Sequence, residues 1–192
     1  MRKSREEAAQ TRKRIVEAAS REFRKNGIVA TGLNDLMKAA GLTRGGFYKH
    51  FASKDQLVAE ACAHAVDTAT GMGMEAQPTI NAAVASYLST RHRDDPATGC
   101  PLAAIGSELS RTDKKTREAA TEGFKRLVAV LAGKSKTQNA RRRALVAVAT
   151  MIGAVTMSRV VTDPGLSAEI LSAAEKSLAA DQSAGDLGRS SC

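Results

Sequence analysis

Residues 31–54 read TGLNDLMKAAGLTRGGFYKHFASK, and the rest of the chain is organised around this stretch. Gly41 is expected to end a first short helix, because glycine readily takes the left-handed conformation that a tight helix end needs. Thr43 is then expected to cap a second short helix through its side chain. Two short helices joined by a glycine turn are typical of the helix-turn-helix, whose second helix enters the DNA major groove. Apolar residues at helical spacing give the first helix a buried face: Leu33, Leu36, Met37 and Ala40.

The second short helix has one apolar side and one polar side. Phe47 and Phe51 lie four residues apart and are expected to pack against the core. Arg44 and Lys49 on the polar side are expected to donate to guanine edges or to phosphates. Two adjacent glycines weaken a helix by about 1 kcal/mol each relative to alanine, which a close approach to a ligand backbone would explain. Ser53-x-x-Gln56 is a capping box that opens a third helix.

Residues 41–57, GLTRGGFYKHFASKDQL, resemble the DNA-binding signature of the TetR family of bacterial transcriptional repressors. The spacing from the turn glycine through Tyr-x-His-Phe to Ser-Lys matches without gaps. The resemblance implies a recognition helix over 43–50 with phosphate contacts from Tyr48, His50 and Lys54. The alternative, a helical hairpin of an unrelated bundle, leaves the polar face unexplained. The expected DNA-binding residues are Thr31, Thr43, Arg44, Gly45, Gly46, Tyr48, Lys49, His50 and Lys54.

The composition predicts an all-α fold of about nine helices. The chain has 192 residues, of which 43% are hydrophobic but only 3% aromatic, so its core must consist mostly of aliphatic side chains. Abundant alanine and the lack of alternating β-branched runs favour helices over strands. We expect a helix-turn-helix head over residues 1–52, a regulatory and dimerisation body over 53–180, and a disordered polar tail over 181–192.

The net charge of +9 is concentrated in the first third of the chain. Residues 1–60 hold 13 Lys and Arg against 7 Asp and Glu, a net of +6. A basic segment beside a helix-turn-helix is the electrostatic footprint of a DNA-binding protein. Three irregularly spaced cysteines and a charged N-terminus without an apolar signal region indicate a reducing compartment. The expected location is therefore the cytoplasm, in association with the nucleoid.

Helical spacing and breakers also divide the rest of the chain. Residues 89–99, STRHRDDPATG, are expected to form a loop because they are charged and contain Pro96 and Gly99. Helices are expected over residues 11–26, 53–70, 79–88, 101–111, 113–132, 144–161 and 166–180.

The segment 144–161, ALVAVATMIGAVTMSRVV, is the most apolar in the chain. A membrane span is one interpretation, but polar residues interrupt the segment, and a helix buried on several sides explains it as well. The resemblance implies that the terminal helices 141–161 and 166–180 form a four-helix bundle with the same helices of a second copy. Such a homodimer would present two heads, about 34–36 Å apart, to a palindromic operator of double-stranded DNA. No membrane partner is expected.

The resemblance also implies a cavity in the body for a small-molecule inducer, whose binding shifts the population away from DNA. GCPLAAIGSEL and DPGLSAEIL look like one subgroup of the family, marked by the GCPLAA motif. Candidate ligand contacts are Tyr87, Phe124 and Met151, although such residues are also ordinary core. Cys100 precedes an expected helix start, where N–H groups lower a thiol pKa, so it is a candidate sensor of oxidants or electrophiles. The alternative for Cys100 is a buried packing residue.

The sequence does not predict an enzyme, and it predicts no catalytic residue, metal or cofactor. Cys62 and His64 are two residues apart on a helix and point in different directions, which disfavours a metal pair. We find no phosphate loop, nucleophile elbow or paired carboxylates. Two alternatives are a small-molecule or thiol-redox sensor that uses Cys100 without DNA, and a membrane-anchored helical protein. Salt-dependent duplex binding separates both from a DNA-binding regulator.

Overall fold

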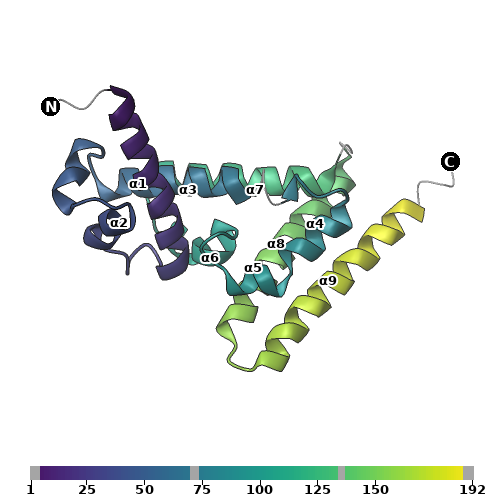
Figure 1. Cartoon of the computed structure of the whole chain (residues 1–192). Coiled ribbons are helices and arrows are strands. Elements are labelled where there is room, and N and C mark those ends of the chain that lie inside the picture. The colour runs from purple at the N-terminus through teal and green to yellow at the C-terminus, as the bar shows by residue number, and fades with distance from the viewer. Residues whose placement is uncertain (1–4, 70–73, 134–136, 188–192) are drawn as a thin grey trace. The chain divides into compact units, whose positions relative to one another are not determined.

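The computed structural model describes residues 5–69, 74–133 and 137–187. Every regular element in this part of the chain is helical, which confirms the predicted all-α fold. Figure 1 shows the elements in chain order: α1 (Arg5–Asn26), α2 (Leu33–Ala39), the 3-10 helix η1 (Arg44–Lys49), α3 (Lys54–Ala69), α4 (Ile80–Tyr87), α5 (Thr90–Asp94), α6 (Pro101–Leu109), α7 (Lys114–Ala132), α8 (Gln138–Val160) and α9 (Pro164–Leu187).

The helices group into two compact units. The first comprises Met1–Ala69 and Pro96–Gly123, and the second comprises Thr70–Asp95 and Phe124–Cys192. This grouping differs from a division at residue 52, because α3 packs along α1 and α6 packs against both of them. The first unit therefore contains α6 and the first part of α7 as well as the predicted head.

One hydrophobic core joins α1, α2, η1, α3 and α6 in the first unit. Positions four apart on α1 supply three of its residues, as an amphipathic helix requires. Gly27 and Gly41 end α1 and α2 with φ of 89° and 69°, which confirms the glycine turn. Buried members of this core include Ile15, Ala19, Phe23, Leu36, Met37, Phe47, Phe51, Leu57, Val58 and Ile105.

Side-chain caps set the start of α3. The Ser53 hydroxyl accepts the Gln56 N–H at 3.1 Å, as the capping box predicts. The Gln56 side-chain oxygen accepts the N–H of Ala52, at 2.8 Å, rather than that of Ser53. α3 therefore begins where local sequence chemistry places it.

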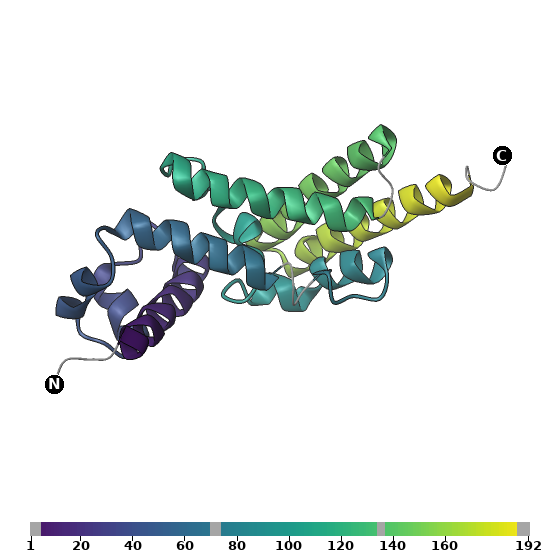
Figure 2. The same ribbon diagram turned by 90° about the horizontal axis from the view of Figure 1, so that it is seen from above.

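In the second unit, α8 and α9 form an antiparallel pair (Figure 2). Asp163 caps α9, because its Oδ1 accepts the N–H groups of Gly165 at 2.7 Å and Leu166 at 3.2 Å. α9 continues to Leu187, so residues 181–187 are helical where a disordered tail is expected from the sequence. Residues 188–192 lie outside the described residues.

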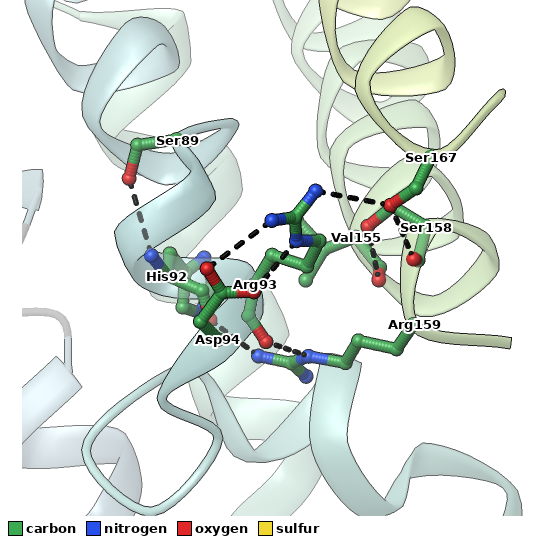
Figure 3. A network of polar contacts seen from close by, with 8 residues as sticks. All are labelled: Ser89, His92, Arg93, Asp94, Val155, Ser158, Arg159 and Ser167. Atoms are coloured by element: carbon green, nitrogen blue, oxygen red, sulfur yellow. Dashed lines mark hydrogen bonds and ion pairs between the residues drawn. The ribbon is translucent and has the colours of Figure 1, made fainter. Parts of the chain in front are cut away.

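α5 occupies part of the segment 89–99 that the sequence predicts as a loop, so this prediction is wrong for residues 90–94. Five residues are too few for a helix that is stable alone. Its C-terminal carbonyls are instead bound by Arg159 of α8, which donates to the oxygen of His92 at 2.6 Å and that of Arg93 at 2.9 Å (Figure 3). The Ser89 hydroxyl caps the other end by accepting the His92 N–H at 3.2 Å.

The same network joins α5 to the α8–α9 pair. Arg93 donates to the Ser167 hydroxyl at 3.1 Å, and that hydroxyl donates to the Ser158 carbonyl at 2.6 Å (Figure 3). Ser158 and Ser167 are 3% and 4% exposed, so the hydrogen bond between them is protected from water. A charged segment that reads as a loop is therefore fixed by long-range contacts.

α8 is long and apolar enough to cross a membrane by length and composition alone, with a mean hydropathy of 1.4 in its most apolar window. Only 39% of that window is buried within the described part of the chain. One face packs inward through Val148, Met151 and Val155. Several apolar side chains on the other face are exposed: Leu145, Val146, Met157 and Val160.

Candidate nucleic-acid interface

η1 is held by its apolar side and presents its polar side to solvent. Phe47 is fully buried, and its ring stacks on that of Phe51 with centroids 5.6 Å apart. Tyr48 is 67% exposed and meets Phe47 edge-on at 5.1 Å. The exposed residues of this segment are Thr43, Arg44, Gly45, Tyr48 and Lys49, whereas Gly46 and His50 are half-buried.

The start of η1 differs from the prediction. Thr43 precedes the helix, but its side chain makes no capping hydrogen bond. The first turn is closed by the backbone instead, with Gly46 N–H donating to the Thr43 carbonyl at 3.0 Å. Two adjacent glycines favour α-helix poorly, so a short 3-10 turn in place of the expected helix has a local cause. The Thr43 hydroxyl is left at the surface.

Internal packing does not require either glycine of η1. A Cβ on Gly45 would meet nothing within 4 Å, and one on Gly46 would lie an ordinary 3.6 Å from Met37 Cε. The backbone at Gly45 is therefore bare toward solvent. A phosphate or base edge can approach it more closely than it could approach any other residue type.

Thr31 and Lys54 lie in different surroundings from the rest of the predicted contact set. Thr31 is 2% exposed, and its hydroxyl donates to the Gly27 carbonyl at 2.5 Å. Its side chain is therefore buried, whereas a contact to DNA, as the sequence predicts, requires it at the surface. The Lys54 ammonium donates to the Ile28 carbonyl at 2.6 Å and lies 5.9 Å from the centre of the Phe23 ring. Both residues hold the connection between α1 and α2.

Arg12 on α1 braces the end of η1, and the sequence analysis missed it. Its guanidinium forms a two-pronged ion pair with Glu60 of α3, of which the Nη2–Oε1 distance is 2.7 Å. Its Nε donates to the His50 carbonyl at 3.3 Å, and its Cζ lies 4.5 Å from the centre of the Phe51 ring. The hydrogen bonds from Arg12 lower the pKa of Glu60. A separation of 48 residues along the chain left no signal for this contact.

The four candidate ligand or sensor residues fall in different units. Tyr87, Phe124 and Met151 belong to the second unit, where the Tyr87 ring packs edge-on against His92 at 4.5 Å. Cys100 belongs to the first unit, immediately before α6, and is 5% exposed.

A cavity of about 10 Å³ in the first unit has room for about one water molecule. Ser20, Arg24, Cys62 and Ile105 contribute to its lining, and none of the four candidates does. Burial raises the pKa of the Cys62 thiol to about 11. Among the residues that the structure describes, no three His, Cys, Asp or Glu side chains are grouped as metal ligands would be.

The fold and this surface define a helix-turn-helix protein. Residues 15–61 match the family described as bacterial regulatory proteins, tetR family, and residues 76–177 match the LmrA/YxaF-like C-terminal domain of transcriptional regulators. The second match alone spans more than half of the chain. The chain belongs to the TetR family of DNA-binding transcriptional regulators, with an LmrA/YxaF-like C-terminal domain.

Relatives and solved structures agree with this assignment. The chain is 48% identical over 58 residues to the regulator TtgR of Pseudomonas putida, a match that spans 30% of this chain and only 28% of TtgR. It is 27% identical over 132 residues to the regulator LmrA of Bacillus subtilis, covering 62% of this chain and 68% of LmrA. A TetR regulator structure from Chloroflexus aurantiacus superposes with a TM-score of 0.71 at 26% identity, covering 91% of this chain and 95% of that one.

Family membership confirms three predictions. The family consists of regulators rather than enzymes, as the sequence indicates. Its members are bacterial regulators of transcription, which implies a cytoplasmic location. The fold, an N-terminal helix-turn-helix domain followed by a helical C-terminal domain, is the predicted one.

Proposed function

We propose that this regulator is a repressor that binds a palindromic operator as a homodimer and releases it when a small-molecule inducer binds. The observation that carries the proposal is the exposed face of η1, with Arg44, Tyr48 and Lys49 around the bare backbone of Gly45. Positive and hydrogen-bonding groups on a short helix suit base edges and phosphates. His50 and Lys54 are assigned to phosphates at the margin of this surface, and operator binding associates the protein with the nucleoid.

The proposed dimer uses α8 and α9, over residues 141–161 and 166–180. The exposed apolar face of α8 supports it, since Val146, Met157 and Val160 are 56%, 47% and 65% exposed. Gly153 lies on the same face, and a Cβ there would meet nothing within 4 Å. Contiguous apolar surface on a soluble protein favours association, and a second copy offers the same face by twofold symmetry.

The inducer is assigned to the second unit, with Tyr87, Phe124 and Met151 as its candidate contacts. Aliphatic and methionine side chains dominate the buried positions of α8, which favours an apolar ligand. Cys100 is kept as a candidate for thiol-based regulation, separate from that site. The GCPLAA motif that starts with Gly99 is proposed to mark the subgroup to which the chain belongs.

Duplex binding by the full chain tests the proposal. The tightest duplex is selected from random-sequence DNA, and its dissociation constant is measured at several salt concentrations. Lys49→Ala and Arg44→Ala should weaken binding by roughly tenfold or more, because a contact to a base edge contributes about 1–3 kcal/mol. A residue that contacts phosphate alone should also reduce the salt slope by about one.

Lys25→Ala is the matched control, since Lys25 is an exposed cation of the same unit on α1. It should leave the affinity for the selected duplex nearly unchanged. Equal affinity of the unmodified protein for selected and unrelated duplexes would contradict the proposed function. An altered base preference in the Arg44 or Lys49 variant assigns that residue to base readout.

A further inference from the structure

The connection between α1 and α2 is held by two charged side chains that act on one peptide unit. Lys54 of α3 donates to the Ile28 carbonyl at 2.6 Å. The Val29 N–H donates to Oε2 of Glu108, from α6, at 2.9 Å. The carbonyl of Ile28 and the N–H of Val29 belong to the same planar peptide group. A cation therefore binds one end of its dipole and an anion binds the other.

The neighbouring residues show that backbone contacts, and not side-chain burial, hold this turn at Val29. Gly27 has a φ of 89°, and a Cβ there would lie 2.8 Å from Oε1 of Glu108. Ile28 is buried at 8% exposure, but the Val29 side chain is 85% exposed and contributes no burial that would hold this turn. Polar contacts to the backbone therefore fix the position of Val29, and Glu108 supplies one of them from 79 residues away.

This turn determines where α2 begins. Gly32 is the N-cap residue of α2, three residues beyond Val29. Thr31, between them, is anchored to the Gly27 carbonyl at 2.5 Å. α2 in turn packs on η1, so a shift of the turn is passed to the exposed face of η1.

We propose that Glu108 is a positioning residue for operator binding: with Lys54 it clamps the Ile28–Val29 peptide group and so fixes the placement of the helix-turn-helix. The inference rests on the proposed function and adds to it a residue of α6 that does not touch DNA. An ammonium group has three donors, so Lys54 keeps two for a phosphate while it binds Ile28. The clamp and the phosphate contact are compatible.

Two variants of the full chain test the clamp, Glu108→Ala and Glu108→Gln. Amide hydrogen exchange of Val29 is followed by NMR, together with affinity for the selected duplex and for an unrelated duplex of equal length. Glu108→Ala should speed the exchange of the Val29 amide and weaken binding of the selected duplex by about tenfold, because a charge-assisted hydrogen bond is lost. Glu108→Gln keeps an acceptor oxygen and should restore most of both.

Glu118→Ala is the control for the loss of one negative charge, since Glu118 is an exposed carboxylate of the same unit. It should not slow or speed the Val29 exchange, and it should not weaken binding. Lys54→Met combined with Glu108→Ala should weaken binding by less than the product of the two single effects, because both act through one peptide group.

Unchanged Val29 exchange in Glu108→Ala would overturn the clamp. Faster exchange with unchanged affinity for the selected duplex would overturn its positioning role. If the unmodified protein selects no preferred duplex, the proposed function fails on its own. The clamp is then decided by Val29 exchange and by the amide resonances of α2, which should shift in Glu108→Ala and be restored in Glu108→Gln.

Discussion

Arg12 illustrates how one side chain can serve several elements of a small domain. It joins α1 to α3 through Glu60, to the end of η1 through the His50 carbonyl, and to the core through the Phe51 ring. Its side chain is 37% exposed and that of Glu60 is 25% exposed, so water screens part of the attraction. Arg12 therefore matters as much for holding these three elements in place as for the free energy that its ion pair contributes.

The Arg12–Glu60 pair should make stability depend on acid pH. The folded pKa of Glu60 is lowered, first by the hydrogen bond from Arg12. The pair therefore stabilises the fold above the ordinary glutamate pKa of about 4.3, and this is lost as the pH falls through the lower folded value. Glu60→Gln should cost about 1 kcal/mol at neutral pH, and the cost should shrink below pH 4 or so.

Urea unfolding of the Glu60→Gln variant and of the unmodified protein at several pH values measures the difference in their free energies of unfolding. Glu17→Gln is the matched control, because Glu17 forms a looser 3.9 Å ion pair with Lys13 at the surface of α1, the helix that carries Arg12. Its free energy of unfolding should follow that of the unmodified protein at every pH. A cost of Glu60→Gln that stays constant down to pH 3 would count against the ion pair.

At the scale of elements, local chemistry was sufficient to predict the boundaries at Gly27, Gly41 and Ser53, but not at Thr43, whose side chain makes no capping hydrogen bond. Gly27, Gly41 and the Ser53 cap behave as expected, because each acts on neighbours within four residues. α5 could not be foreseen, since Arg159 stabilises it from 66 residues away. The clamp on Ile28 and Val29 escaped prediction for the same reason, because long-range side-chain contacts leave no periodic pattern.

The contact between α7 and α3 depends on a glycine. A Cβ on Gly123 would lie 2.5 Å from Cγ2 and 2.9 Å from Cγ1 of Val66. Alanine in an open helix position is more stable than glycine by about 1 kcal/mol, but overpacking costs about 1–3 kcal/mol. Gly123→Ala should therefore lower the free energy of unfolding.

Denaturant unfolding with a double variant isolates the cause. Val66→Ala removes the methyl groups that the new Cβ would meet, so Gly123→Ala should be tolerated or even stabilising in that background. If Gly123→Ala is equally destabilising with and without Val66, the close approach of the two helices is not the reason.

For the whole molecule, the surface of α8 should decide the oligomeric state. Val146 is 56% exposed on its apolar face, and a buried unpaired carboxylate there would oppose association. Val146→Glu should therefore be monomeric at concentrations at which the unmodified protein is a dimer, as measured by sedimentation velocity. Its affinity for a palindromic duplex should fall, because a monomer reaches only one half-site.

The control is Lys25→Glu, which introduces a negative charge at an exposed position of α1, outside the proposed interface. This variant should leave the dimer intact. A Val146→Glu protein that sediments as a dimer would argue against α8 as the interface. The sequence suggested such an interface from the apolar content of 144–161, but which side is left exposed required the packing of α8 on α9 and α5.

The burial of Cys62 makes it an internal reporter of how often the first unit opens. Its thiol is 4% exposed and its pKa is about 11, so at neutral pH the folded chain offers an alkylating reagent almost no thiolate. Labelling must then wait for transient separation of α1, α3 and α6, and its rate measures that opening equilibrium. Pulse alkylation of Cys62, read by mass spectrometry, would measure local opening of the first unit without any introduced probe. Operator DNA should slow this alkylation.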